Sequence, residues 1–323
     1  MRHHWVQEAY LKAWCDPDTP SGQEPYVWVF DKEARVGKKR APRKLFRLAD
    51  LYKDRRDKAA TNPMWFEAGI SRIESEFIRV RDTVVAKGGV LDEFDQAVLA
   101  TYVGLSFVRT PKYIDHAAGP WRQMVEMMDE MRASFTRTPP DASPTQSPDL
   151  FRHSIEAQEQ SISEEETREA ANHPAQTVLA PLVNGQAKIL AQMTCMLLMT
   201  NQDSGFNTSD SPCVHFDEKD LLNPSFMRGG MASSSHEVTF PVMPGCLAFY
   251  GWSKRKENNG HCWYQEADDI VVDEMNWRTR TFCHDKFVVR RDVTRDYWFD
   301  RGQAADTEAG QGTVEPTDPK ASC

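Results

Sequence analysis

The sequence predicts an α+β fold: a central helical bundle packed on a mixed sheet built mainly from the C-terminal third of the chain. Two observations favour it. Apolar residues recur at helical spacing through the middle of the chain. After Cys195 the pattern changes to short apolar runs separated by Gly, Pro and Asn, which is typical of sheet strands. A strand-like run at 26–31, near the N-terminus, is a candidate to join that sheet.

Three helices are expected in the first half. The first opens at Asn62-Pro63 and ends at Gly88-Gly89, with apolar residues at four-then-three spacing. The second runs from about Asp92 to an interruption near Thr110-Pro111, because proline restricts the residue before it. Apolar residues between 121 and 131 mark the third. These aromatic and methionine stripes are most simply core.

The second half begins with a segment that lacks periodic apolar residues, so 136–149 should be a flexible insertion. An acidic helix is expected over about 152–171, and another over 176–194, where Pro181 is tolerable only near the start or at a kink. The tail 302–323 is small and polar, and we expect it to be disordered. Residues 1–301 then form a single domain. The expected strands are 196–200, 213–216, 238–240, 247–250, 270–272 and 287–289.

Composition narrows the class of protein. The chain of 323 residues is 40% hydrophobic and contains 9 Trp, enough for a large core. No apolar run reaches the ~20 residues of a membrane helix, and the N-terminus lacks the apolar stretch of a signal peptide. Seven cysteines without a Cys-x-x-Cys argue against a disulfide framework. We therefore expect a cytoplasmic protein with no membrane partner.

Charge is distributed unevenly. Residues 32–58 carry twelve Lys and Arg against four acidic residues, a net charge of +8, whereas the whole chain carries −9. Such a separation can steer RNA or DNA toward one face. The alternative is a solvated hairpin whose cations pair with the acidic body, or a surface for a protein partner or homo-oligomer. The candidate nucleic-acid contacts are Lys38, Lys39, Arg40, Arg43 and Lys44.

Two short stretches suggest a site. His3 and His4 stand at the N-terminus without an obvious packing reason. Asn207-Thr208-Ser209-Asp210-Ser211-Pro212 is a turn that can expose a carboxylate at the end of a strand. The two stretches are far apart in sequence, so a shared site would require the fold to join them.

The order of these motifs resembles a family. Its members open with His-His-x-x-Pro-x-x-x-Leu-x-x-Phe, and here Gln7 stands at the proline and Trp14 at the phenylalanine. The collinear matches over residues 3–290 are 27–32, 73–75, 109–111, 207–212, 240–244 and Asn276. In these features the chain resembles the mostly bacterial family catalogued as domain of unknown function 4238. The resemblance implies no activity, but it adds Glu74, Arg109 and Asn276 to the candidate site.

The candidate catalytic set is therefore His4, His3, Asp210, Glu74, Arg109 and Asn276. Asp210, Glu74 and His4 could hold a divalent metal that activates water, and Arg109 could neutralise a phosphate. The structural alternative is equally concrete. In it, His4 bonds a backbone carbonyl, Asp210 caps a turn, and Glu74 and Arg109 form an ion pair between helices.

Other cofactors have less support. Cysteines and histidines at 213–215, 261–262 and 283–284 lack zinc-finger spacing, and no nucleotide-cofactor motif is present. The leading functional hypothesis is a nuclease-like hydrolase, a metal-assisted phosphodiesterase if it is an enzyme, acting as a toxin or phage-defence effector. The alternative is a non-catalytic ligand- or protein-binding module of a bacterial defence or regulatory system.

Overall fold

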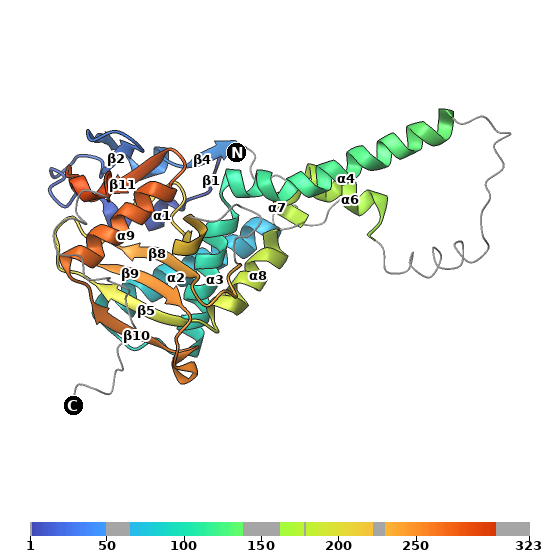
Figure 1. Cartoon of the computed structure of the whole chain (residues 1–323). Helices are drawn as coiled ribbons and strands as arrows, with labels where there is room; N and C mark the ends of the chain where they lie inside the picture. The colour runs from blue at the N-terminus through green and yellow to red at the C-terminus, as the bar shows by residue number, and fades with distance from the viewer. Residues whose placement is uncertain (1, 50–64, 138–161, 178, 222–229, 302–323) are drawn as a thin grey trace.

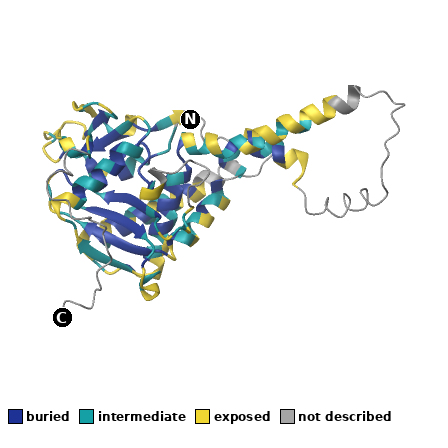
Figure 2. Ribbon diagram, viewed as in Figure 1, coloured by how far each residue is buried: buried dark blue, intermediate teal, exposed yellow. Residues whose placement is uncertain are grey.

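The computed structural model describes residues 2–49, 65–137, 162–177, 179–221 and 230–301. It has the α+β fold that the sequence predicts, with helices and several sheets. Figure 1 shows a body of sheets and helices from which two helices, α4 and α6, project as an arm. Figure 2 shows that the sheet strands and the inner helix faces of the body are its most buried parts.

In the described part of the chain, the largest sheet has five strands in the order β10-β5-β9-β8-β7, and only β10 runs parallel to its neighbour. Side chains of a strand alternate between its two faces. On β5, Cys195 and Leu197 therefore join the main core, while Met196 and Leu198 join a second cluster on the opposite face. The strands are β5 (Thr194–Met199), β7 (Val214–Phe216), β8 (Glu237–Met243), β9 (Cys246–Gly251) and β10 (Cys262–Glu266).

Helices cover both faces of this sheet. One face contacts α2 (Trp65–Thr83), α3 (Glu93–Val108) and α8 (Leu179–Leu190), and the other contacts α9 (Asp269–Phe282). Phe77 of α2 stacks on Tyr102 of α3 with ring centroids 3.8 Å apart, and both are fully buried. Burying one such ring is worth about 1.5–3 kcal/mol, so this contact is a main tie between α2 and α3. Both rings also contact Phe240 of β8, which joins the two helices to the sheet.

A second sheet joins the two ends of the chain. Its order is β3-β2-β11-β6, so β11 (Lys286–Val289) lies between β2 (Val27–Asp31) and β6 (Thr208–Ser209), and β3 (Lys38–Arg40) is at the edge. A separate pair is formed by β1 (Arg2–His4) and β4 (Arg47–Ala49).

The segment after β1 is anchored deep in the core. It forms α1 (Glu8–Leu11) and a short 3-10 helix at Lys12–Trp14. Tyr10 donates its hydroxyl to the carbonyl of Pro241 at 2.7 Å, and the Trp14 indole donates to the carbonyl of Phe206 at 2.8 Å. Both aromatic residues are fully buried. The N-terminal segment is thus fixed against β8 and the 206–210 region.

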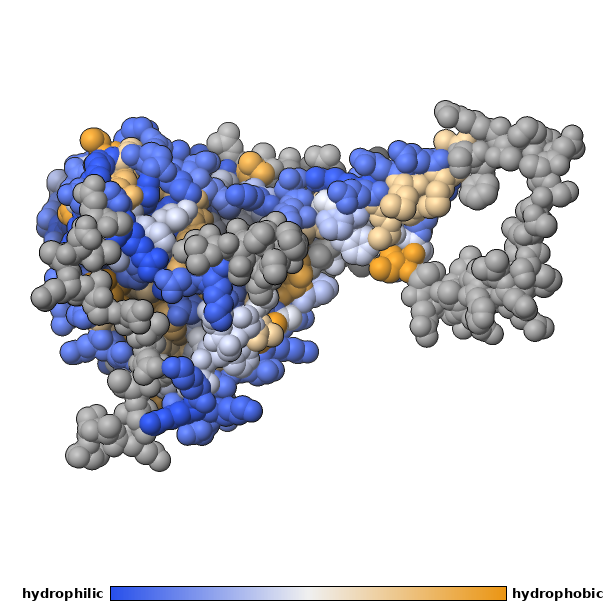
Figure 3. Space-filling view, in the orientation of Figure 1, coloured by the Kyte–Doolittle hydropathy of each residue, from blue (hydrophilic) through white to orange (hydrophobic). Residues whose placement is uncertain are grey.

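The arm consists of α4 (Pro111–Arg137) and α6 (Glu164–Asn172), and α7 (Pro174–Thr177) leads back to α8. Ser163 caps α6 by accepting from the Glu166 amide, as in a capping box. Met124, Met127 and Met131 of α4 are each more than 40% exposed. Figure 3 shows a paler, more apolar strip along the arm on an otherwise mostly hydrophilic face. None of the described helices is both long and apolar enough to cross a membrane.

Several sequence predictions are confirmed, including the strand at 26–31, the helix that begins after Asp92 and the strands near 196, 214, 239, 248 and 288. The strand expected at 270–272 is wrong, because these residues begin α9. Asp268 caps that helix by accepting from the Val271 amide at 2.8 Å. Val272, Met275 and Thr279 are buried at helical spacing. A short β-branched run alone cannot distinguish a strand from the first turn of a buried helix.

Other boundaries differ by a few residues. The helix expected to continue to 194 ends at Leu190, and β5 begins at Thr194. Pro181 lies in the first turn of α8, as its missing amide requires. Residues 136–137 belong to α4, whereas the rest of the insertion 136–149 lies outside the described residues. The same holds for the acidic helix before 162 and for the tail 302–323.

Candidate functional site

The predicted histidines lie in the two-stranded ladder at the N-terminus. His3 pairs with Leu48 and His4 with Arg47, and the Trp5 amide donates to the carbonyl of Phe46 at 2.9 Å. Phe46 has a φ of +47°, a left-handed conformation that is strained for an aromatic residue. Strain of this kind is concentrated at functional sites, which directs attention to the ladder.

His4 is half-buried, and its Nδ1 is buried without a hydrogen-bond partner among the described residues. Burial is the largest influence on its pKa and lowers it below the usual value. The carboxylate of Glu8, a hydrogen bond to the Leu45 backbone and the carboxylate of Glu74 oppose that change, and Arg47 adds to it. The imidazole is therefore neutral near pH 7, a form that can accept a proton or a ligand atom.

Glu74 and Arg109 form an ion pair between α2 and the C-terminal end of α3. The distance from Nη1 of Arg109 to Oε1 of Glu74 is 2.6 Å. The Arg109 side chain is 1% exposed and that of Glu74 16%. The Arg109 guanidinium also lies 5.6 Å from the centre of the Tyr102 ring. A buried guanidinium needs this compensation, so Glu74 has a structural task whatever else it does.

Asp210 is a turn anchor. Its carboxylate is almost fully buried and accepts hydrogen bonds from three consecutive backbone amides, those of His284 at 2.8 Å, Asp285 at 2.7 Å and Lys286 at 3.0 Å. Its backbone carbonyl accepts from the indole of Trp5 at 3.0 Å. Asp210 therefore holds the start of β11 and also touches the N-terminal segment.

Asn276 is also structural. Its side chain is fully buried in α9, accepts from the Asn207 amide at 2.7 Å and donates to the carbonyl of Gly205 at 3.0 Å. The chain must turn tightly there, since Gly205 has a φ of +62° and an added Cβ would lie 2.1 Å from the carbonyl oxygen of Pro244. Asn276 thus fixes the segment that leads to Asp210.

The fold brings these predicted residues around one place without merging them into a single cluster. His4 is close enough to Glu74 for the carboxylate to raise its pKa, and Trp5 bonds Asp210. The oxygens of both carboxylates, however, already bind other groups. Among the described residues, no three His, Cys, Asp or Glu side chains gather in an arrangement that could hold a metal ion. A metal shared by His4, Glu74 and Asp210 would have to displace the Arg109 pair and the backbone amides.

The basic segment is partly neutralised. Lys38 pairs with Asp31 at 3.0 Å, and Arg43 pairs with Glu24. Lys32 donates to the carbonyls of Thr281 and Cys283 at the end of α9. These contacts agree with the structural alternative for part of the segment.

The remainder of the described segment still presents cations. Lys39 lies 4.4 Å from the centre of the Tyr26 ring and 5.0 Å from that of Trp28. Arg40 and Lys44 are exposed. Residues 50–58 of the predicted segment lie outside the described residues.

Two histidine features were not part of the predicted site. Nε2 of His284 is buried without a hydrogen-bond partner among the described residues. Burial lowers the pKa of His284, Asp210 opposes that change, and Lys112 reinforces it. Lys112, which follows the Arg-Thr-Pro motif, is thus close to the Asp210 turn. The one sequence signal for this contact is the position of His284 just before the strand expected at 287–289.

The second missed feature is a pair of histidines. Nδ1 of His215 lies 3.0 Å from Nε2 of His236, and the His215 ring contacts Phe107 with centroids 3.9 Å apart. Burial, with His236 second, lowers the pKa of His215 to about 3. The sequence offered no signal for the pairing, because the two histidines are 21 residues apart and His236 follows a run of serines without a recognisable motif.

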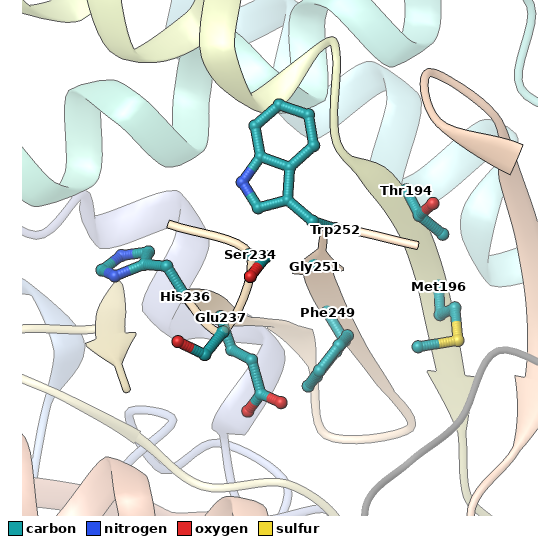
Figure 4. Close-up of a pocket in the computed structure, with 9 residues that line it drawn as sticks. Thr194, Met196, Ser234, His236, Glu237, Phe249, Gly251 and Trp252 are labelled. Carbon is teal, nitrogen blue, oxygen red and sulfur yellow. The ribbon is translucent and has the colours of Figure 1, made fainter. Parts of the chain in front are cut away.

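His236 also borders a small pocket at one end of the large sheet. The pocket encloses about 70 Å³ and is lined by residues that include Thr194, Glu237, Phe249 and Trp252. Figure 4 shows the His236 ring at its edge, pointing away from Phe249 and Trp252. None of the predicted site residues lines it. This pocket is therefore not the candidate site.

Comparisons with known proteins give one match. A family profile described as "Protein of unknown function (DUF4238)" matches residues 2–294, nearly the whole described body. No curated protein and no solved structure matches the chain.

Proposed function

The chain belongs to the DUF4238 family, and we propose that it is a nuclease-like hydrolase acting on a nucleic acid or another phosphate-containing target. Such an activity would suit a toxin or a phage-defence effector. One observation carries the proposal: the basic segment and the histidines meet in the same ladder. The chain runs from the basic edge strand β3 through Pro42–Lys44 into β4, whose Arg47 lies opposite His4.

The exposed cations would bind the polyanion. Phosphate contacts give affinity without reading sequence, and Lys39, Arg40 and Lys44 are the cations of this segment best placed to supply them. Lys39 is held over two aromatic rings, a platform on which an unpaired base could also stack. Lys39 and Arg40 lie on β3 and Lys44 ends the 3-10 helix Pro42–Lys44, so all three come shortly before β4 along the chain.

His4 is the residue to which we assign proton transfer. In its neutral form it would take a proton from water as the water oxygen bonds to phosphorus. The bond between phosphorus and the ester oxygen would break, and the departing oxygen would take its proton from solvent. Glu8 and Glu74, which raise the pKa of His4, would stabilise the imidazolium formed in that step. We assign no metal to Glu74 or Asp210, since their oxygens are bound to Arg109 and to backbone amides.

A binding module without catalysis is the second candidate. It is favoured by the same saturation of the two carboxylates, while Nδ1 of His4 is buried without a hydrogen-bond partner among the described residues. In that case the ladder and the basic strand would hold a phosphate-containing ligand without cleaving it.

The first experiment tests cleavage. Purified protein is incubated with end-labelled RNA and DNA oligonucleotides, with Mg²⁺, with Mn²⁺ and with a chelator. His4→Asn should reduce cleavage by about 10²–10⁴-fold while retaining binding. The matched control is His261→Asn, at an exposed histidine, and should cleave normally. Cleavage that survives His4→Asn would contradict the assigned role, and binding without cleavage by the native protein would favour the binding module.

The second experiment tests the basic strand. Reversal of Lys39, Arg40 and Lys44 to Glu should weaken nucleic-acid binding strongly at low salt and reduce the salt dependence of the affinity by about two to three phosphate contacts. A control with the same charge change reverses exposed residues on other elements, namely Lys87, Lys188 and Lys256. Equal weakening in both variants would show that only net charge matters and would remove this surface from the proposal.

A further inference from the structure

Two cysteines face each other across neighbouring strands of the large sheet. Cys262, the first residue of β10, is in register with Cys195 of β5, and the Cys195 amide donates to the carbonyl of His261 at 2.9 Å. Neighbouring strands lie about 4.8 Å apart. A disulfide needs Cα atoms about 4.4–6.8 Å apart, so the register already satisfies the main requirement of a bridge.

The thiols are in contact but not bonded. Both cysteines are free in the structure. A hydrogen bond between the two thiols is the largest cause that raises the pKa of Cys195, and burial adds to it. The hydroxyl of Tyr250, which is paired with Cys195 from the other side, acts in the opposite direction. Cys195 is thus held between a second thiol and a phenol.

The two cysteines differ in access. Cys195 is 6% exposed, whereas Cys262 is half-buried on a strand at the edge of the sheet. An accessible thiol beside a buried one is the arrangement in which a first oxidation product is trapped by a resolving cysteine. Among the described strands, β10 pairs with β5 alone, and its Tyr264 hydroxyl donates to the carbonyl of Gly89 at 2.7 Å.

We propose that Cys195 and Cys262 are a peroxide-responsive pair, whose oxidation forms an intramolecular disulfide that fastens the edge strand β10 to β5. This inference does not depend on the proposed hydrolase activity. In a reducing compartment the pair remains as two thiols, and a peroxide converts it.

The reaction balances with one peroxide. The Cys262 sulfur, as the thiolate, attacks one oxygen of hydrogen peroxide; the oxygen–oxygen bond breaks and water leaves after protonation, giving a sulfenic acid. The Cys195 sulfur then attacks the sulfenic sulfur. The sulfur–oxygen bond breaks, and the hydroxyl departs as water with the Cys195 proton. Two thiols lose two electrons, and the peroxide is reduced to two water molecules.

The test is a thiol count and a map on the folded full chain. Protein is treated with a small excess of hydrogen peroxide, denatured and alkylated. We expect five alkylated cysteines in place of seven, and seven again after reduction by dithiothreitol. Since no Lys or Arg separates Cys195 from Cys213, one tryptic peptide carries both, and the map is made in a Cys213→Ser background. The expected crosslink joins that peptide to the one with Cys262.

Variants complete the design. Cys262→Ser lies at a half-buried position and should fold, as checked by circular dichroism, yet lose the crosslink and retain all its remaining thiols under peroxide. Cys213→Ser alone should form the crosslink as the native chain does. Three results would overturn the proposal: all thiols remain alkylatable, Cys262 is oxidised to a sulfinic acid while Cys195 stays reduced, or the crosslink joins Cys262 to Cys246.

Discussion

The Asp210 anchor yields the sharpest prediction, because its contacts are explicit. Oδ1 accepts from the amide of His284, and Oδ2 accepts from those of Asp285 and Lys286. In Asp210→Asn the amide group has one acceptor oxygen and one NH₂. If the oxygen takes the site of Oδ2, the NH₂ faces the His284 amide and one buried donor loses its partner. The two remaining bonds also lose their charge assistance.

The magnitude follows from these losses. An unsatisfied buried donor costs about 1–3 kcal/mol, and weakening two charge-assisted bonds adds about 1 kcal/mol or more. We expect the free energy of unfolding to fall by about 2–4 kcal/mol, which for a chain of this size lowers the melting temperature by on the order of 3–6 °C. Urea denaturation followed by circular dichroism measures the first quantity and calorimetry the second.

A matched control is Asp203→Asn. The Asp203 carboxylate also accepts hydrogen bonds, from Arg291 at 2.7 and 3.1 Å, but its side chain is 69% exposed. Exposed ion pairs contribute less than about 1 kcal/mol, so this variant should remain near native stability. If Asp210→Asn is as stable as Asp203→Asn but loses activity, Asp210 is a functional residue and the anchor interpretation is wrong.

Three further predictions concern stability. Gly205→Ala should cost at least about 3 kcal/mol because of its positive φ and the contact at 2.1 Å, whereas Gly185→Ala, in an open helical position, should stabilise slightly; equal melting temperatures would contradict the tight turn. Glu74→Ala should cost about 3 kcal/mol in urea denaturation, because it removes the carboxylate that compensates Arg109; an unchanged midpoint would show that the pair is dispensable. His215 has a pKa of about 3 in the folded state, below its unfolded value, so its contribution to stability is present above pH 6.5 and declines as the pH falls. Between pH 6.5 and pH 5 the unfolding free energy of the native chain should therefore fall by about 2 kcal/mol more than that of His215→Asn. Parallel pH profiles of the two proteins would refute this.

Local patterns were enough to predict much of the fold. The apolar spacing on α2 and α3 reports which face is buried, and the Asp92 cap reports where α3 begins, because both depend on residues within a few turns. The same logic failed at Ile270, where a β-branched run follows a cap. The pairing of β2 with β11 was beyond prediction, since nothing local in Val29 specifies Val288 as its partner.

The candidate site was predicted in part for a related reason. The residue types at His4, Glu74 and Asp210 were visible in the sequence, but their partners were not. Whether a carboxylate faces solvent or three backbone amides depends on where a loop more than 70 residues away comes to lie. The contact between Cys195 and Cys262 depends on strand register in the same way.

The position of β11 has a consequence for how the chain folds as it is made. β2 pairs with β11, and Lys32 bonds the carbonyl of Cys283, 251 residues further along the chain. At about 5–20 residues per second, synthesis of that intervening stretch takes roughly 13–50 s. Throughout that time β2 lacks its partner β11, and its apolar face is exposed to other nascent chains on the same messenger RNA. A chaperone that binds β2 during translation would therefore raise the yield of native protein more than a chaperone added after the chain has left the ribosome.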